Sequence, residues 1–208
     1  MESCNRRLII GIAALAVLLM LAVSVAMFRS EISRIRAEKQ RRAKTMGQLP
    51  DFSLVNQSGR SVTRSDLLGH VIIVDFVFTR CQGPCPALSD QMARLQDAWF
   101  RLPEVKLVSI SVDPEWDKPE VLSAYAERYG AKGSVWHFLT GEKSRVYDLI
   151  RNGFRASVEV TDGPHQILHS TQLAVVDKRG RIRAYLDGDS PTLRMDATPV
   201  VRRLLAEN

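Results

Sequence analysis

Cysteine is scarce in this chain, with three residues among 208. A small domain held together by disulfides carries many more cysteines, so a disulfide scaffold is excluded. Cys4 precedes a long apolar run, whereas the cysteine of a bacterial lipoprotein follows such a run, so Cys4 is interpreted as a bystander thiol. Cys81 and Cys85 are therefore the one cysteine pair that can carry chemistry in the rest of the chain.

Net charge is also missing from most of the chain. Residues 51–208 hold twenty basic and twenty acidic side chains, whereas residues 1–50 hold nine Lys and Arg against three Asp and Glu. A nucleic-acid-binding domain carries its basic patch on the folded surface, so no nucleic-acid partner is expected. A basic segment beside an apolar run indicates a membrane surface instead.

The apolar run from Leu8 to Phe28 has 21 residues and no charged side chain. A helix of that length reaches about 31 Å, which matches one hydrocarbon core. The sequence therefore predicts a short tail (1–7), a transmembrane anchor (8–28), a basic juxtamembrane stalk (29–47) and a folded domain (48–208). A cleaved signal peptide is the alternative, because small residues that suit a cleavage site end the run.

The charges that flank the run favour one orientation of the anchor. Arg6 and Arg7 precede it, and seven basic residues follow between Arg29 and Lys44. The positive-inside rule would place the C-terminal domain in the cytoplasm. Large domains translocate despite flanking charge, so this rule does not decide the orientation by itself.

Strand and helix patterns alternate through the folded domain. Strand patterns cover 51–63, 70–79, 105–112, 135–140 and a hairpin at 170–188, and helix patterns cover 86–99, 118–130, 141–154 and the C terminus from 191. Asp117 is placed to cap the second helix and Gly130 to end it. Alternation of this kind predicts an α/β fold with a parallel βαβ unit, to which the hairpin adds antiparallel strands.

The pair Cys81 and Cys85 lies where the first central strand meets its helix, which is the position of the dithiol in a thioredoxin-like fold. Pro86 suits the first helical position, which would make Cys85 the N-cap. The unpaired N–H groups and the helix dipole favour a thiolate there. Three readings stay open on spacing alone: a redox dithiol, a metal site, or two ordinary buried thiols.

A soft metal ion would need a third ligand, for which histidine is the natural choice. The chain has four histidines. His70 precedes the central strand at the far end from the dithiol, and His137 falls within a strand, so we expect surface and packing roles. His165 and His169 lie in a loop that enters a strand, where binding sites are often built. The residues alone do not choose between these two.

Several segments between Pro50 and Gly188 together resemble the Sco/SenC family of copper-binding proteins of cytochrome oxidase assembly. "DFVFTRCQGPCP" is similar to the family's strand and CxxxCP motif. "SISVDPEWDKPEVLSAYAERYG" and "WHFLTG" resemble its next strands and helix, and "HSTQLAVVDKRGRI" resembles its histidine-bearing strand and turn.

The resemblance selects His169 as the third ligand, so that Cys81, Cys85 and His169 bind copper as Cu(I) or Cu(II). It implies a thioredoxin-like fold with an inserted β-hairpin, and a metal-free dithiol that cycles to a disulfide. The implied role is delivery of copper to the CuA site of cytochrome c oxidase subunit II, or reduction of that site's cysteines, with other copper carriers as further partners. The implied location is a single-pass inner-membrane protein with its soluble domain on the extracytoplasmic side, periplasmic or intermembrane.

Two carboxylates are candidates for supporting roles around the dithiol. Asp75 lies in an otherwise apolar strand, where an unpaired carboxylate is costly, so we expect a partner for it near the dithiol or in the core. Asp113 follows the second strand and is placed either to face the site or to shape its own loop.

The favoured hypothesis is a membrane-anchored copper metallochaperone rather than a conventional enzyme. The main alternative is a thiol-disulfide oxidoreductase that acts on partner cysteines without carrying copper. A peroxiredoxin-like peroxidase is disfavoured, since Phe78 stands where those enzymes usually carry Thr or Ser. A copper-responsive signalling protein is a further alternative.

Overall fold

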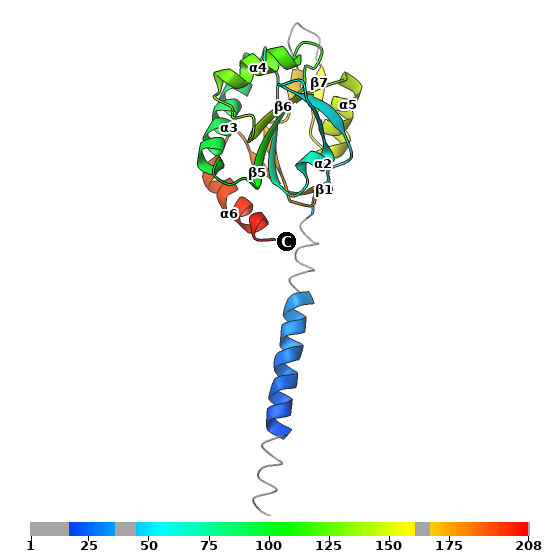
Figure 1. Cartoon of the computed structure of the whole chain (residues 1–208), viewed down its shortest axis with the longest axis vertical. Coiled ribbons are helices and arrows are strands. Elements are labelled where there is room, and N and C mark those ends of the chain that lie inside the picture. The colour runs from blue at the N-terminus through cyan, green and yellow to red at the C-terminus, as the bar shows by residue number, and fades with distance from the viewer. Residues whose placement is uncertain (1–16, 36–44, 161–166, 208) are drawn as a thin grey trace, which may run out of the picture. The chain divides into compact units, whose positions relative to one another are not determined.

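The computed structural model describes residues 17–35, 45–160 and 167–207. The chain divides into two compact units, Met1–Lys44 and Thr45–Asn208. Figure 1 shows both units.

The described part of the first unit is one helix over residues 17–35. Its large apolar side chains from Val17 to Phe28 are each at least half exposed. Among the described residues, no helix is both long and apolar enough to cross a membrane. The first half of the predicted anchor, 8–16, lies outside the described residues, so the anchor stays a prediction.

The second unit is built on a mixed sheet whose eight described strands run in the order β1-β10-β9-β4-β5-β6-β2-β3. The strands are β1 (Gly47–Gln48), β2 (Ser53–Asn56), β3 (Ser61–Thr63), β4 (Val71–Val77), β5 (Val105–Ser111), β6 (Trp136–Thr140), β9 (Gln172–Val176) and β10 (Arg181–Asp187). A separate pair, β7 (Val158–Val160) and β8 (Ile167–His169), precedes β9 along the chain.

The central strand β4 is buried along its whole length. Its sequence is rich in β-branched residues with no polar alternation, which is typical of a strand covered on both faces. β5 and β6 continue the sheet in parallel, and β9 pairs with the other edge of β4 in the antiparallel direction. The predicted βαβ unit with an added hairpin is therefore confirmed.

Helices cover both faces of the sheet (Figure 1). They are α2 (Arg64–Leu67), α3 (Cys85–Trp99), α4 (Pro119–Arg128), α5 (Lys143–Asp148), the π-helical turn η1 (Leu149–Gly153) and α6 (Leu193–Leu205). Apolar residues of α3, α4 and α6 form one core with the sheet, and those of α2, α5 and η1 form the other. The result is a three-layer α/β unit with the dithiol at the carboxyl end of β4.

The N-cap residues predicted for two helices were each wrong by one residue. Helix α3 begins at Cys85 with Pro84 as its N-cap, because the Pro84 carbonyl already accepts a hydrogen bond from the Leu88 N–H at 3.0 Å. Helix α4 has Lys118 rather than Asp117 as its N-cap, because the Asp117 side chain bonds elsewhere. The predicted end of α4 is confirmed, since Gly130 follows it with a φ of +62°.

Candidate functional site

The two cysteines differ in exposure. Cys85 is fully buried in the first turn of α3, whereas Cys81 is half-buried on the loop before it. The loop is compact, since the Cys81 N–H donates to the Phe78 carbonyl at 3.2 Å and the Gly83 N–H donates to the Cys81 sulfur at 3.4 Å. Both thiols are free in this structure.

Burial raises the pKa of the Cys85 thiol well above its usual range, and its hydrogen bond with Cys81 raises the pKa further. The expected preference for a thiolate at Cys85 was therefore wrong for the reduced, metal-free protein. Desolvation of a buried sulfur outweighs the field of one helix end. Burial therefore favours the neutral thiol form of Cys85 in the metal-free protein.

His169 is the histidine that the fold brings to the dithiol. It ends β8, and its Nε2 lies 3.2 Å from the Cys85 sulfur, although 84 residues separate the two. Its Nδ1 lies 3.1 Å from the Ser170 carbonyl. A carbonyl only accepts, so this bond requires the proton on Nδ1 and leaves the Nε2 lone pair directed at Cys85.

The environment of His169 keeps its imidazole neutral. The ring packs edge-to-face against Phe78, with ring centroids 5.8 Å apart. Burial lowers the pKa of His169 below its ordinary value. A neutral imidazole with a second-nitrogen hydrogen bond to a carbonyl is the usual form of a metal-ligating histidine.

Cys85 links the three side chains, because its sulfur lies 3.2 Å from His169 Nε2 and Cys81 is close enough to raise the pKa of its thiol. Among the described residues, no group of three Cys, His, Asp or Glu side chains is already arranged to hold a metal ion. The donor types nevertheless suit a soft ion, because two thiolates and an imidazole are favoured ligands of Cu(I). Binding would require both thiols to lose their protons.

Asp75 has the partner that its burial demands. It is fully buried on β4 opposite Ser109, whose hydroxyl donates to Oδ1 at 2.5 Å. The Trp136 indole N–H donates to the same hydroxyl at 2.8 Å. Burial raises the pKa of Asp75 to about 7. Among the described residues, Asp75 makes no hydrogen bond to either thiol, and it acts on Cys85 through its charge, which raises the pKa of that thiol.

Asp113 holds the residue before Cys81 rather than facing the thiols. The Arg80 guanidinium donates to Asp113 Oδ2 from Nε at 3.1 Å and from Nη2 at 2.5 Å. The same guanidinium lies over the Trp116 ring, 4.4 Å from its centroid. Of the two roles expected for Asp113, the structure favours shaping the loops.

The remaining histidines lie away from the dithiol or outside the described residues. His70 precedes β4, and His137 lies on β6 opposite Val108, toward the other end of the parallel strands. Burial lowers the pKa of His137, consistent with its expected packing role. His165 lies outside the described residues.

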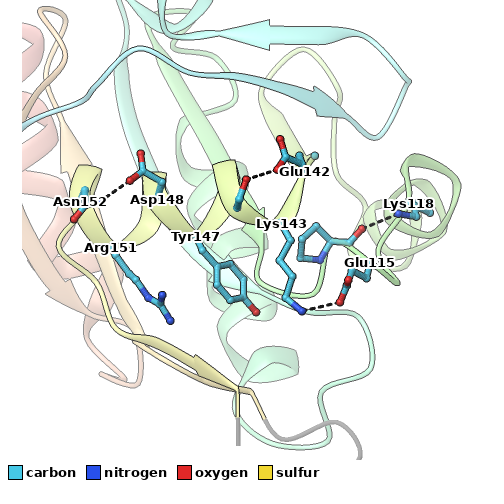
Figure 2. A pocket seen from close by; sticks show the side chains of 11 residues that line it. Glu115, Lys118, Glu142, Lys143, Tyr147, Asp148, Arg151 and Asn152 are labelled. Carbon is cyan, nitrogen blue, oxygen red and sulfur yellow. Dashed lines mark hydrogen bonds and ion pairs between the residues drawn. The ribbon is translucent and has the colours of Figure 1, made fainter.

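A cleft of about 800 Å³ lies between α5 and the loop after β5 (Figure 2). Charged side chains dominate it, but several are paired, as Lys143 is with Glu115 at 2.7 Å. The Tyr147 hydroxyl donates to the Val112 carbonyl at 3.0 Å. Neither thiol nor His169 lines this cleft, so it is separate from the dithiol.

Sequence reasoning missed Asp117 as a neighbour of the site. It belongs to the loop that follows β5, and its carboxylate contacts Thr79, two residues before Cys81. A signal was present, because three acids follow a strand that runs parallel to the one before the dithiol. The carboxyl ends of adjacent parallel strands meet at one edge, so those acids and the dithiol loop had to be neighbours.

Comparison with known proteins gives one consistent result. The family model described as SCO1/SenC matches residues 38–204. The SCO1 protein homolog of Bacillus subtilis is 33% identical over 65% of this chain and 71% of its own length. The crystal structure of a SCO1/SenC family lipoprotein from Bacillus anthracis superposes with a TM-score of 0.73 at 32% identity, over 78% of this chain and 98% of that one.

A second similar solved structure is that of BsSco, described as a member of the Sco family of cytochrome c oxidase assembly proteins with a disulfide switch. It superposes with a TM-score of 0.71 at 29% identity, over 79% of this chain and 97% of that one. The α/β unit described above is thus the thioredoxin-like Sco fold. The family model and these relatives together show that this chain belongs to the SCO1/SenC family.

Proposed function

We propose that this chain is a membrane-anchored copper metallochaperone that takes part in assembly of the CuA site of cytochrome c oxidase subunit II. The observation that carries the proposal is the position of His169 at the Cys81–Cys85 loop, with Nε2 of the histidine 3.2 Å from the Cys85 sulfur. Membership of the SCO1/SenC family supports it, since BsSco is described as belonging to a family of oxidase assembly proteins.

The proposed copper ligands are Cys81, Cys85 and His169. Two thiolates and an imidazole stabilise Cu(I) and can also hold Cu(II). Three protein ligands leave a position through which the ion can pass to the cysteines of subunit II or come from another copper carrier. Half-buried Cys81 is the sulfur that a partner would reach first, because Cys85 is fully enclosed.

Copper loading and thiol oxidation exclude each other in this mechanism. Loss of two electrons and two protons from Cys81 and Cys85 forms a disulfide and removes two of the three ligands. The same pair can therefore serve as a reductant for a partner disulfide when copper is absent. This second activity is the thiol-disulfide oxidoreductase alternative, and the adjacency of the two thiols favours it.

The proposal includes an anchor at 8–28 and a soluble domain on the extracytoplasmic side of the membrane. Nine large apolar side chains of the described helix between Val17 and Phe28 are exposed, and a bilayer would cover them. Retention of the full chain in membranes washed with alkaline carbonate is expected. Release into the wash would contradict the anchor.

The function is tested by titrating the reduced full chain, in detergent, with Cu(I) against a competing chelator. A Cys4→Ser background removes the third thiol. We expect stoichiometric binding that weakens at least about tenfold in His169→Ala, because a buried ligand is lost. Equal affinities in the two proteins would reject the metallochaperone and leave the oxidoreductase.

A further inference from the structure

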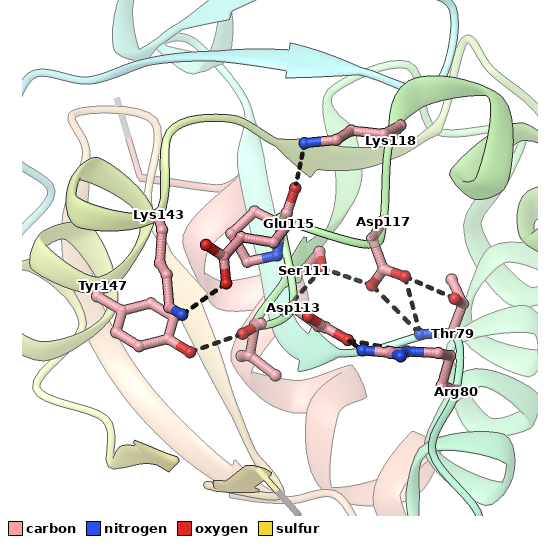
Figure 3. A network of polar contacts seen from close by, with 11 residues as sticks. Thr79, Arg80, Ser111, Asp113, Glu115, Asp117, Lys118, Lys143 and Tyr147 are labelled. Carbon is pink, nitrogen blue, oxygen red and sulfur yellow. Dashed lines mark hydrogen bonds and ion pairs between the residues drawn. The ribbon is translucent and has the colours of Figure 1, made fainter. Parts of the chain in front are cut away.

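Asp117 is a fully buried carboxylate outside the proposed ligand set, and its partners lie on two neighbouring segments. The Thr79 backbone N–H donates to both carboxylate oxygens, to Oδ2 at 3.2 Å and to Oδ1 at 3.4 Å, and the Thr79 hydroxyl donates to Oδ1 at 2.5 Å. The Ser111 hydroxyl donates to Oδ2 at 2.5 Å. Figure 3 shows the contacts from Thr79 and Ser111 meeting at the Asp117 carboxylate.

The loop that carries Asp117 is itself folded tightly. The Asp117 N–H donates to the Asp113 carbonyl at 2.8 Å, and the Asp113 N–H donates to the Ser111 hydroxyl at 3.0 Å. The Val112 N–H donates to the Val77 carbonyl at 2.8 Å, which ties this loop to the end of β4. Asp117 is thus presented to the dithiol loop from a hydrogen-bonded support.

Both residues that precede Cys81 are held by this support. Asp117 holds Thr79 through its backbone and hydroxyl, and Asp113 holds Arg80 through a two-pronged ion pair. Asp117 is the more buried of the two carboxylates. Loss of the Asp117 carboxylate would leave the Thr79 and Ser111 hydroxyls without this acceptor.

We propose that Asp117 is a positioning residue, which fixes the Thr79–Arg80 segment so that the Cys81 sulfur stays beside the Cys85 sulfur. The proposal rests on the proposed function in taking these two cysteines as the working pair. With the segment released, the Cys81 loop would sample more conformations, and the two sulfurs would meet less often. The disulfide would then form less favourably, because its stability depends on that effective concentration.

The test measures the equilibrium of the reduced full chain with glutathione disulfide, in the Cys4→Ser background and without metal. In this reaction two electrons and two protons pass from Cys81 and Cys85 to glutathione disulfide, giving a protein disulfide and two glutathione thiols. Asp117→Asn replaces one acceptor with a donor. Thr79→Val removes the hydroxyl but keeps the size, and Thr79→Ser restores the hydroxyl.

The matched control is Asp177→Asn. Asp177 is also buried and accepts hydrogen bonds from Arg181 and Arg183, but it follows β9 at the end where Val176 pairs with Ile72, away from the dithiol. The Asp177→Asn variant should have a lower free energy of unfolding than the parent. Its equilibrium constant with glutathione disulfide should equal that of the parent.

We expect the equilibrium constant to fall about tenfold in Asp117→Asn and at least about threefold in Thr79→Val. Thr79→Ser should stay within about twofold of the parent. An unchanged constant in Thr79→Val, or an equal fall in Asp177→Asn, would overturn the proposal. No copper enters this measurement. If the chain failed to bind copper, the proposed function would be rejected, but the role of Asp117 in disulfide formation would still be tested by the glutathione equilibrium.

Discussion

At the scale of single residues, Asp75 links the stability of the domain to pH. It is fully buried, and its one hydrogen-bond partner among the described residues is Ser109, at Oδ1. Its Oδ2 has no hydrogen-bond partner among the described residues. Burial therefore raises the pKa of Asp75 to about 7, far above the value of a solvated carboxyl.

Asp75→Asn is expected to remove part of the pH dependence of unfolding. Because the folded pKa of Asp75 is raised, the folded state favours the protonated form, and stability is lost as the pH rises toward and through 7. The advantage of the variant over the parent in free energy of unfolding should grow by on the order of 4 kcal/mol from pH 4 to pH 8. Urea unfolding at several pH values measures this, and two parallel curves would contradict it.

At the scale of elements, the pair β7–β8 delivers His169 to the dithiol. Val158 on β7 pairs with His169 on β8, and the Ser170 N–H donates to the Ser157 carbonyl at 3.1 Å. From η1, the Arg151 guanidinium donates to the Val158 carbonyl at 2.7 Å from Nη2 and 3.3 Å from Nε. The π-helical turn therefore fastens the strand that positions the histidine.

Arg151→Met is expected to loosen β7–β8 without unfolding the domain. A charged donor to a carbonyl contributes about 1.5–3 kcal/mol, so the Ser170 amide should exchange its hydrogen at least about tenfold faster. Amides of β4 and β5 should exchange at parent rates. Arg145→Met is the control, since this exposed side chain of α5 pairs with Glu142, the N-cap of that helix. Equal Ser170 rates in the two variants would contradict the role of Arg151.

Most elements could be predicted from the sequence because their signals are local. The apolar run of β4 and the periodic apolar face of α3 are each complete within one segment. The cap of α4 could not be predicted in the same way. Asp117 had two uses, capping its own helix or bonding Thr79, and the choice depends on a contact 38 residues away.

The cysteine pair of the site could also be predicted from the sequence, because its signal is local. Cys81 and Cys85 share one loop, so their proximity followed from spacing. His169 reaches them only through the pairing of Val158 with His169, which no local pattern indicates, and the residues alone left His165 equally eligible. Family resemblance supplied that choice, and the described structure places His169 beside Cys85.

At the scale of the whole molecule, the proposed function links copper loading, thiol oxidation and stability. Copper that binds the folded state stabilises it by mass action, by about 2.7 kcal/mol at a free concentration one hundred times the dissociation constant. A disulfide between Cys81 and Cys85 removes that ligand set. The reduced and oxidised domains should therefore differ in whether copper stabilises them.

The central claim is that one imidazole and two thiolates bind the same copper ion. The most direct test is the X-ray absorption spectrum at the copper edge of the Cu(I)-loaded full chain in the Cys4→Ser background, beside its His169→Ala variant. We predict two sulfur neighbours and one imidazole nitrogen in the parent, with the imidazole signal lost in the variant. An imidazole signal unchanged in His169→Ala, or a copper shell without sulfur, would contradict the claim.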